Sequence, residues 1–181
     1  MDIKVMFKTT ALALALGGMG LSGSALAADV TLNITGNVKA SPCKLDLGGS
    51  ATKEVKLNGG KNIEAAAMAN SGEYTDDEEF SLKLVGCPDA TTSVTATFSG
   101  DPSTESNDLY KNQATTMAAE SIQIELRNQK GDNLGNNKTM NAVVNAAGEA
   151  TFDLKARAYT SQGGVKPGSI STAVQVGFVY H

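Results

Sequence analysis

The sequence ends in the stretch Gly168-Ser169-Ile170-Ser171-Thr172-Ala173-Val174-Gln175-Val176-Gly177-Phe178-Val179-Tyr180-His181. Every even position from Ile170 to Tyr180 is apolar or β-branched, and this period of two predicts a strand with one apolar face. A strand that carries such a face on a free edge invites pairing with another chain. The sequence offers nothing downstream, so we expect the neighbour of this strand to come from elsewhere.

Short alternating segments recur upstream, separated by turn-forming sequences such as Ser99-Gly100-Asp101-Pro102 and Lys130-Gly131-Asp132-Asn133. A series of short strands of this kind predicts an all-β sandwich. Residues 63–70 are the only plausible helix, one or two turns long. The alternating apolar positions are Val30, Leu32, Ile34 and Val38; Leu45 and Leu47; Val55 and Leu57; Phe80, Leu82 and Leu84; Val94, Ala96 and Phe98; Ile122, Ile124 and Leu126; and Phe152, Leu154, Ala156 and Ala158.

The first residues have the features of an export signal. Lys4 and Lys8 give a positive start, residues 10–21 are apolar or small, and Ala25-Leu26-Ala27 is a small-x-small exit. This pattern predicts a secretory signal peptide at residues 1–27, cleaved after Ala27. The apolar part is too short and too rich in glycine for a membrane anchor. We therefore expect an exported chain of residues 28–181.

Charge and length narrow the possible classes of partner and architecture. The chain carries 15 Lys and Arg against 19 Asp and Glu, a formal net charge of −4, which argues against nucleic acid as a partner. Residues 28–181 suit one domain with a single core. Within them, residues 28–40 stand apart as a strand that precedes the main body at 41–181.

Both cysteines, Cys43 and Cys87, lie in the exported part of the chain. An even pair in an exported protein predicts a disulfide. The bridge would close a loop of about 45 residues, for which the chain-entropy model gives about 4 kcal/mol of stabilisation. The rival interpretations are weaker, because a zinc site needs more Cys or His ligands and a nucleophilic Cys needs a His.

No catalytic or metal-binding pattern is present in the sequence. The single histidine, His181, is the last residue, and a frayed terminus cannot hold an imidazole within hydrogen-bonding reach of a nucleophile. The run Asp76-Asp77-Glu78-Glu79 lacks the glycine and the ligand spacing of a calcium loop, so we interpret it as a solvated acidic loop. We predict no enzyme, no cofactor and no small-molecule substrate.

These features together resemble the pilin subunits of chaperone–usher fimbriae, within the type 1 fimbrial group. The likeness rests on the leader, a short N-terminal strand with Gly36 late in it, Cys43 soon after, Cys87 before a proline, and the C-terminal strand. That family has a penultimate Tyr and a Gly fourteenth from the end, here Tyr180 and Gly168. Four strings resemble the minor, tip-adaptor type of subunit: Ala28-Asp29-Val30-Thr31, Phe98-Ser99-Gly100, Tyr110-Lys111-Asn112-Gln113 and Ile122-Gln123-Ile124-Glu125-Leu126.

The resemblance implies an incomplete immunoglobulin-like β-sandwich that lacks its seventh strand, with a donor-strand extension at 28–40 and a pilin domain at 41–181. In this family a periplasmic chaperone fills the resulting groove, and the extension of the next subunit replaces it at the outer-membrane usher. The implied donor residues are Val30, Leu32, Ile34, Gly36 and Val38. The implied acceptor groove and chaperone-binding strand comprise Gly168, Ile170, Val174, Val176, Phe178, Tyr180 and His181, whose carboxylate would be gripped by basic chaperone residues.

The resulting hypothesis is a structural subunit of a cell-surface fimbria that polymerises by donor-strand exchange as a minor adaptor near the tip. A major rod subunit is the first alternative and a single-domain adhesin the second. A self-complemented monomer, in which residues 30–38 pair within their own chain, is a further one. The expected partners are neighbouring fimbrial subunits, a periplasmic chaperone and an outer-membrane usher.

Overall fold

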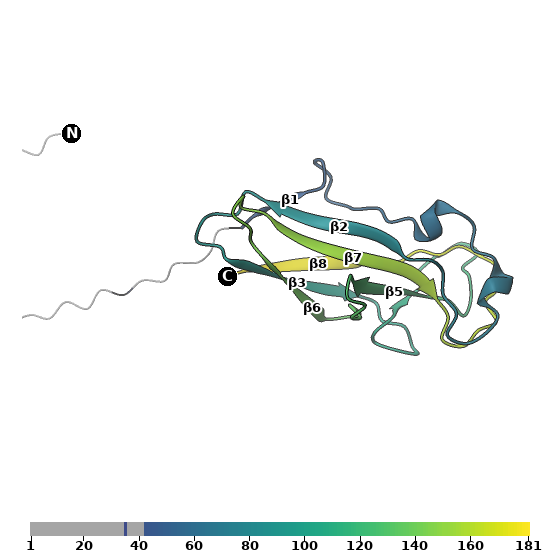
Figure 1. Cartoon of the computed structure of the whole chain (residues 1–181). Helices are drawn as coiled ribbons and strands as arrows, with labels where there is room; N and C mark the ends of the chain where they lie inside the picture. The colour runs from purple at the N-terminus through teal and green to yellow at the C-terminus, as the bar shows by residue number, and fades with distance from the viewer. Residues whose placement is uncertain (1–34, 36–41) are drawn as a thin grey trace, which may run out of the picture. The chain divides into compact units, whose positions relative to one another are not determined.

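The computed structural model describes residue 35 and residues 42–181. The predicted signal peptide at 1–27 and the predicted donor residues Val30, Leu32, Ile34, Gly36 and Val38 lie outside these residues. From Pro42 onward the described chain belongs to a unit that spans Val38–His181. It forms two antiparallel β-sheets and two short 3-10 helices (Figure 1).

The larger sheet has five strands in the order β1-β2-β7-β5-β4. Strand β7 lies at its centre and pairs with β2 along one side and with β5 along the other. The central strand therefore has both of its edges satisfied. The strands of this sheet are β1 (Lys44–Asp46), β2 (Glu78–Val85), β4 (Tyr110–Lys111), β5 (Gln123–Asn128) and β7 (Ala150–Tyr159).

The smaller sheet has three strands in the order β6-β3-β8. These are β6 (Lys138–Val143), β3 (Ser93–Gly100) and β8 (Val174–Tyr180). The C-terminal strand β8 pairs antiparallel with β3 from Val94↔Tyr180 to Gly100↔Val174. Its other edge has no strand beside it within the described residues.

The core lies between the facing sides of the two sheets. Because side chains alternate between the two faces of a strand, every second residue points into this space, and most of these residues are apolar. Phe98 on β3 and Phe152 on β7 are fully buried there, with 0% exposure. A smaller cluster of Met68, Ala119, Ile122 and Ala158 extends the core past one end of the sheets. The predicted all-β sandwich is confirmed.

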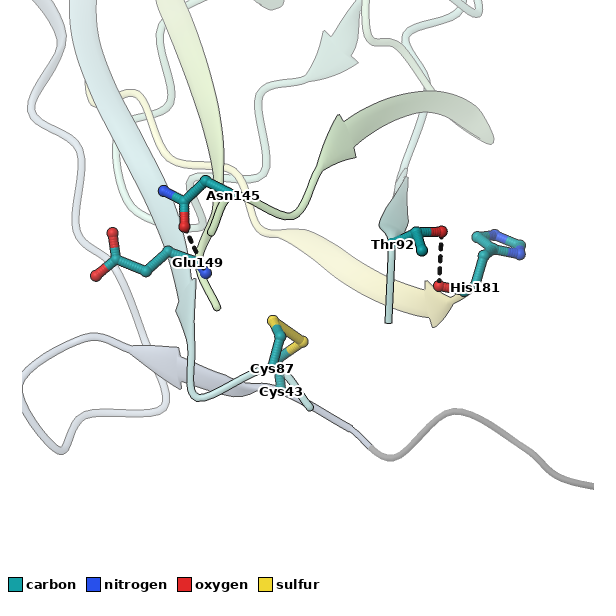
Figure 2. The surroundings of a disulfide bond; sticks show 6 residues. All are labelled: Cys43, Cys87, Thr92, Asn145, Glu149 and His181. Atoms are coloured by element: carbon teal, nitrogen blue, oxygen red, sulfur yellow. Dashed lines mark hydrogen bonds between the residues drawn. A yellow bond between two sulfur atoms is a disulfide. The ribbon is translucent and has the colours of Figure 1, made fainter. Parts of the chain in front are cut away.

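The predicted disulfide is confirmed. It joins Cys43, just before β1, to Cys87, just after β2 (Figure 2). The loop that connects β6 to β7 lies beside it, because the Cys87 N–H donates to the Gly148 carbonyl at 3.0 Å. Asn145 Oδ1 in turn accepts the Glu149 N–H at 3.0 Å (Figure 2). The bridge and this loop therefore stabilise the same end of the sandwich.

Three elements differ from the sequence-based expectation. Strands β4 and β6 were not predicted, because β4 has two residues and β6 places only Met140 and Ala142 toward the core. The helix expected at 63–70 is a single 3-10 turn, η2 (Ala65–Met68), in which only Met68 is buried. A second turn, η1, covers Leu57–Gly60. No helix in the described part of the chain is long and apolar enough to cross a membrane.

Candidate functional site: an open groove beside β8

Strand β8 carries an apolar face that its own chain only half covers. Val174, Val176, Phe178 and Tyr180 alternate with exposed residues, and each is of intermediate burial although each packs against the core. The register partners of Val176, Phe178 and Tyr180 on β3 are fully buried, for example Ala96 opposite Phe178. The half-burial therefore comes from the free edge of β8 and not from its pairing with β3.

A groove of about 1540 Å³ runs along this free edge. The side chains of β8 form one wall, and apolar residues from both sheets form the floor. Phe178 also contacts the buried core, where its ring centroid lies 5.7 Å from that of Phe152. The floor residues that line the groove are Phe80, Leu82, Phe98, Tyr110, Ile122, Ile124, Leu126, Leu154 and Ala156.

The segment 51–57, between β1 and η1, also lines the groove. Its side chains Val55 and Leu57 pack against the core. Residues 53–55 nevertheless form no backbone–backbone hydrogen bond within the described chain. An extended segment with unused backbone groups, like the free edge of β8, is ready to pair with an added strand.

The two tyrosines of this region differ in burial. Tyr110 is fully buried, and its hydroxyl donates to the Leu134 carbonyl at 2.8 Å. Burial raises the pKa of Tyr110 to about 12. Burial also raises the pKa of Tyr180 above its ordinary value of 10.0. Both hydroxyls are therefore neutral at physiological pH. Tyr110 lines the groove, whereas Tyr180 is not among the lining residues.

The structure places Gly168 and Ile170 before the regular strand, which begins at Val174 and not at Ile170 as the alternation predicted. Both residues line the groove. Gly168 lies so close to residues 117–119 that a Cβ at this position would overlap the backbone of Met117 and Ala119. Ile170 packs against both core clusters.

His181 extends the β3–β8 ladder by one residue. Its carbonyl accepts the Thr92 N–H at 2.7 Å, and its own N–H donates to the Ser93 carbonyl at 2.9 Å. The imidazole Nε2 lies 3.1 Å from Thr95 Oγ1, on an exposed part of the surface. Figure 2 shows this residue near the disulfide end of the sandwich. The C-terminus is thus held by β3 beyond the last residue of β8.

The chemistry of the groove is that of a docking surface. Its floor consists of aliphatic and aromatic side chains, and hydrogen-bonding capacity is concentrated in the unused backbone groups of its two walls. Among residue 35 and residues 42–181, no group of three or more His, Cys, Asp or Glu side chains is arranged to hold a metal ion. The groove is therefore shaped for an extended peptide with alternating apolar side chains.

Comparison with known proteins identifies the origin of this architecture. The family model described as "Fimbrial protein" matches residues 32–181. The chain belongs to the fimbrial protein family. The prediction of a chaperone–usher fimbrial subunit, exported through the periplasm to the cell surface, is thereby confirmed.

Relatives of this fimbrial subunit cover almost its whole length. Protein FimG of Escherichia coli strain K12 is 32% identical over 160 residues, which cover 88% of this chain and 89% of FimG. The S-fimbrial adhesin protein SfaS of Escherichia coli O6:K15:H31 strain 536 is 35% identical over 175 residues, 96% of this chain and 99% of SfaS. In fold, the chain is similar to the P pilus rod subunit PapA, with a TM-score of 0.63 and 16% identity over 78% of this chain and 100% of PapA.

Sequence reasoning found one wall of the groove and missed much of the rest. The alternation of residues 170–180 indicated the β8 wall, whereas the unpaired backbone of 53–55 has no sequence signature. Asn112 and Gln113 were noted only as part of a family-like string, yet their side chains bond to the backbone ahead of β8. Their polar, turn-like context gave no sign of that contact.

Proposed function

We propose that this fimbrial subunit polymerises by donor-strand exchange, accepting a strand in the groove beside β8 and donating residues 30–38 to its neighbour. The observation that carries the proposal is the groove itself, with an apolar floor and unused backbone groups on both walls. A strand added there would pair with β8 and complete the sandwich. Addition of a strand to an exposed edge is a known mode of recognition, and chaperone–pilin complexes are an example of it.

The energetics favour a long-lived joint. The proposed donor residues Val30, Leu32, Ile34 and Val38 would bury four apolar side chains, each contributing ~1.5–3 kcal/mol, or on the order of ten kcal/mol before the cost of ordering the strand. Main-chain hydrogen bonds to the free edge of β8 would add to this. Gly36 contributes no side chain and would allow a close backbone approach.

Three kinds of partner follow from this proposal. A periplasmic chaperone would occupy the groove first, with the carboxylate of His181 and the adjoining Tyr180 at its contact surface. An outer-membrane usher would then mediate replacement of the chaperone strand by the extension of the neighbouring subunit. The subunit would act through assembly alone, with no catalytic role.

The proposed place in the fibre is that of a minor adaptor near the tip. Two observations support it: the similarity to FimG and the adaptor-like strings, such as Tyr110-Lys111-Asn112-Gln113. A major rod subunit would use the same groove, so the number of copies per fibre separates the two roles. The similarity to SfaS, named as an adhesin, favours a single-domain adhesin as a second candidate, and binding of the isolated subunit to cell-surface glycans would support it.

The groove is tested by the paired substitution Val176→Thr and Phe178→Ser in the mature chain. The measurement is the melting temperature with and without synthetic donor peptides from candidate neighbours, including the peptide of residues 28–40. We expect a large peptide-induced rise for the wild type and a much smaller rise for the variant. Val179→Thr on the exposed side of the same strand is the matched control. Equal rises in all three proteins would exclude β8 as the acceptor.

Deletion of residues 30–38 tests the donor half separately. The shortened subunit should still respond to donor peptides, because its groove is intact, but it should fail to complement a second subunit. Incorporation into fibres at the normal level, scored by immunoelectron microscopy, would show that these residues are not the donor strand.

A further inference from the structure

The groove is longer than the strand that borders it. The ladder between β3 and β8 ends at Gly100↔Val174, whereas Ile170, Ser171 and Thr172 still line the groove beyond that point. These residues have no strand beside them in the described structure. Something else must hold this segment in line with β8.

Asn112, just after β4, holds the first part of the segment with its side-chain amide. Its Nδ2 donates to the carbonyls of Ser169 and Ala119 at 2.9 and 3.0 Å. Its Oδ1 accepts the Ser171 N–H at 2.9 Å. One side chain thus supplies the donor and the acceptor that a neighbouring strand would supply from its backbone.

Gln113 holds the second part. Its backbone N–H donates to the Ser171 carbonyl at 2.6 Å, and its Oε1 accepts the Ala173 N–H at 3.0 Å. Its Nε2 donates to Asp101 Oδ2 at 2.6 Å, which fixes the orientation of the amide. Both amide side chains are partly buried. We call Asn112 and Gln113 together the amide clamp.

The backbone groups that the clamp bonds belong only to odd-numbered residues of the segment. Its contact with Thr172 is through the side chain, whose Oγ1 donates to Gln113 Oε1 at 3.5 Å. The bonded backbone groups of Ser169, Ser171 and Ala173 point toward the clamp. At the far end of the same chain segment, the backbone groups of His181 point toward β3 in the same way. Backbone groups alternate in direction along an extended chain. The N–H and C=O of Ile170 and Thr172 form no backbone–backbone hydrogen bond within the described residues, and alternation directs them to the groove side.

We infer that the amide clamp lengthens the acceptor edge of β8, so that an incoming strand pairs with residues 170–180 and not only with Val174–Tyr180. This inference rests on the proposed donor-strand function and adds Asn112 and Gln113 as positioning residues for it. The clamp keeps Ile170 and Thr172 extended and in line before any strand arrives. The partner that fits this edge is therefore an extended strand. It is about four residues longer than a strand that would pair with the seven residues of β8 alone.

Amide hydrogen exchange on the wild-type mature chain tests the inference directly. The probe is the synthetic peptide of residues 28–40, added in excess. We expect slowed exchange at the amides of Ile170 and Thr172 together with those of Val176 and Phe178. Slowed exchange at Val176 and Phe178 alone overturns the extended edge and leaves the proposed function intact. No slowing anywhere on β8 overturns the proposed function, and this inference with it.

The paired substitution Asn112→Ala and Gln113→Ala isolates the clamp. We expect about tenfold weaker peptide binding, consistent with losing a few net hydrogen bonds, and loss of protection at Ile170 and Thr172 with Val176 and Phe178 still protected. Asn112→Asp is the gentler second variant, since it retains the acceptor for the Ser171 N–H. Unchanged binding and protection in both variants would show that the clamp only anchors a loop.

Peptide length and a matched control complete the design. The peptide of residues 28–40 is shortened by four residues, at one end or at the other. The peptide that lacks the residues facing Ile170 and Thr172 should bind the wild type and the clamp variant equally. The peptide shortened at the opposite end should still bind the wild type more tightly than the clamp variant. Equal differences for both shortened peptides would contradict a local effect at Ile170.

Asn145→Ala is the matched control variant. It removes two comparable side-chain bonds, to the amides of Ala147 and Glu149, at the disulfide end. It should leave binding unchanged.

Discussion

Strands β7 and β8 share the same sequence period but differ in how far their apolar faces are buried. On β7, Phe152, Leu154 and Ala158 are at most 1% exposed, because β2 and β5 flank the strand on both sides. On β8, Val176 and Phe178 are only partly buried, because β3 flanks one side and the groove lies along the other. The difference in burial therefore comes from the number of neighbouring strands and not from the type of side chain.

The outward sides of the two strands differ as well. On β7, Lys155 and Arg157 form ion pairs with Glu79 and Glu125 at 2.9 and 2.5 Å. On β8, the outward residues Gln175, Gly177 and Val179 carry no charge. The central strand is thus satisfied on both faces and both edges by its own chain, whereas the described chain leaves the inner face of β8 partly exposed and one of its edges free.

The largest expected effect comes from removing one aromatic ring from each strand. Phe152→Ala should lower the free energy of unfolding by about 3–5 kcal/mol, because it leaves a cavity in a closed core. Phe178→Ala should cost clearly less in the free subunit, since its ring is already partly solvated. Urea denaturation measures both. With a donor peptide bound, the cost of Phe178→Ala should approach that of Phe152→Ala, and a cost that does not change on binding would contradict an unfinished inner face.

The two tyrosines sharpen the comparison through pH. The pKa of Tyr110 is raised to about 12, whereas an unfolded tyrosine titrates near 10. Its contribution to stability is therefore complete below pH 10 and is lost as the pH rises from 10 to 12, by roughly 2–3 kcal/mol. Tyr110→Phe should remove most of this alkaline loss, measured by thermal melting at pH 9 and pH 11.

Tyr180 is the matched case on β8. Its pKa is raised by partial burial, so Tyr180→Phe should change the alkaline loss less than Tyr110→Phe does in the free subunit. A bound donor strand should increase the burial of Tyr180 and so enlarge its effect. An equal effect with and without the peptide would place Tyr180 outside the groove.

Two glycines provide a smaller contrast. Gly168→Ala should cost about 1–3 kcal/mol, because the new Cβ would overlap the backbone of residues 117–119. Gly177→Ala, on the outward side of β8, meets no atom within 4 Å and should change stability by less than about 1 kcal/mol. Equilibrium unfolding of both variants checks this difference, which would vanish if residues 117–119 could move aside freely.

The smallest effect is expected at the outward ion pair of β7. Glu79→Gln removes the partner of Lys155 in a pair whose carboxylate is 61% exposed, so we expect a loss of only about 0.2–1 kcal/mol, reduced further by salt. Denaturation at low and high ionic strength measures it. A salt-independent loss would show that the outward face of β7 contributes through packing and not through charge.

The sequence predicted the architecture because its signals were local. Alternation at Phe80–Leu84, Val94–Phe98, Ile122–Leu126, Phe152–Ala158 and Ile170–Tyr180 identified five strands, and the cysteine pair identified the disulfide. Strand β6 was missed because only Met140 and Ala142 of its six residues pack with the core, and its pairing with β3 decides its conformation. The helix expected at 63–70 is a 3-10 turn of four residues, whose buried residue Met68 packs in the smaller core cluster.

The candidate site was predicted on one side only. The apolar face of β8 is visible as a pattern, but the start of the strand is not, since Ile170 and Thr172 continue the alternation without a ladder. The bonds that align them come from Asn112 and Gln113, nearly sixty positions earlier in the chain. Contacts at such a separation depend on the fold and leave no local trace in the sequence.

The place of β8 in the three-stranded sheet also sets the order in which the subunit can fold. Its partner β3 lies about eighty positions earlier, so the ladder from Val94↔Tyr180 to Gly100↔Val174 cannot form until the last residues have been synthesised and exported. Without β8, the smaller sheet would consist of β3 and β6 alone, and a two-stranded ribbon is only marginally stable on its own. The smaller sheet and the edge that borders the groove are therefore completed in the same late event.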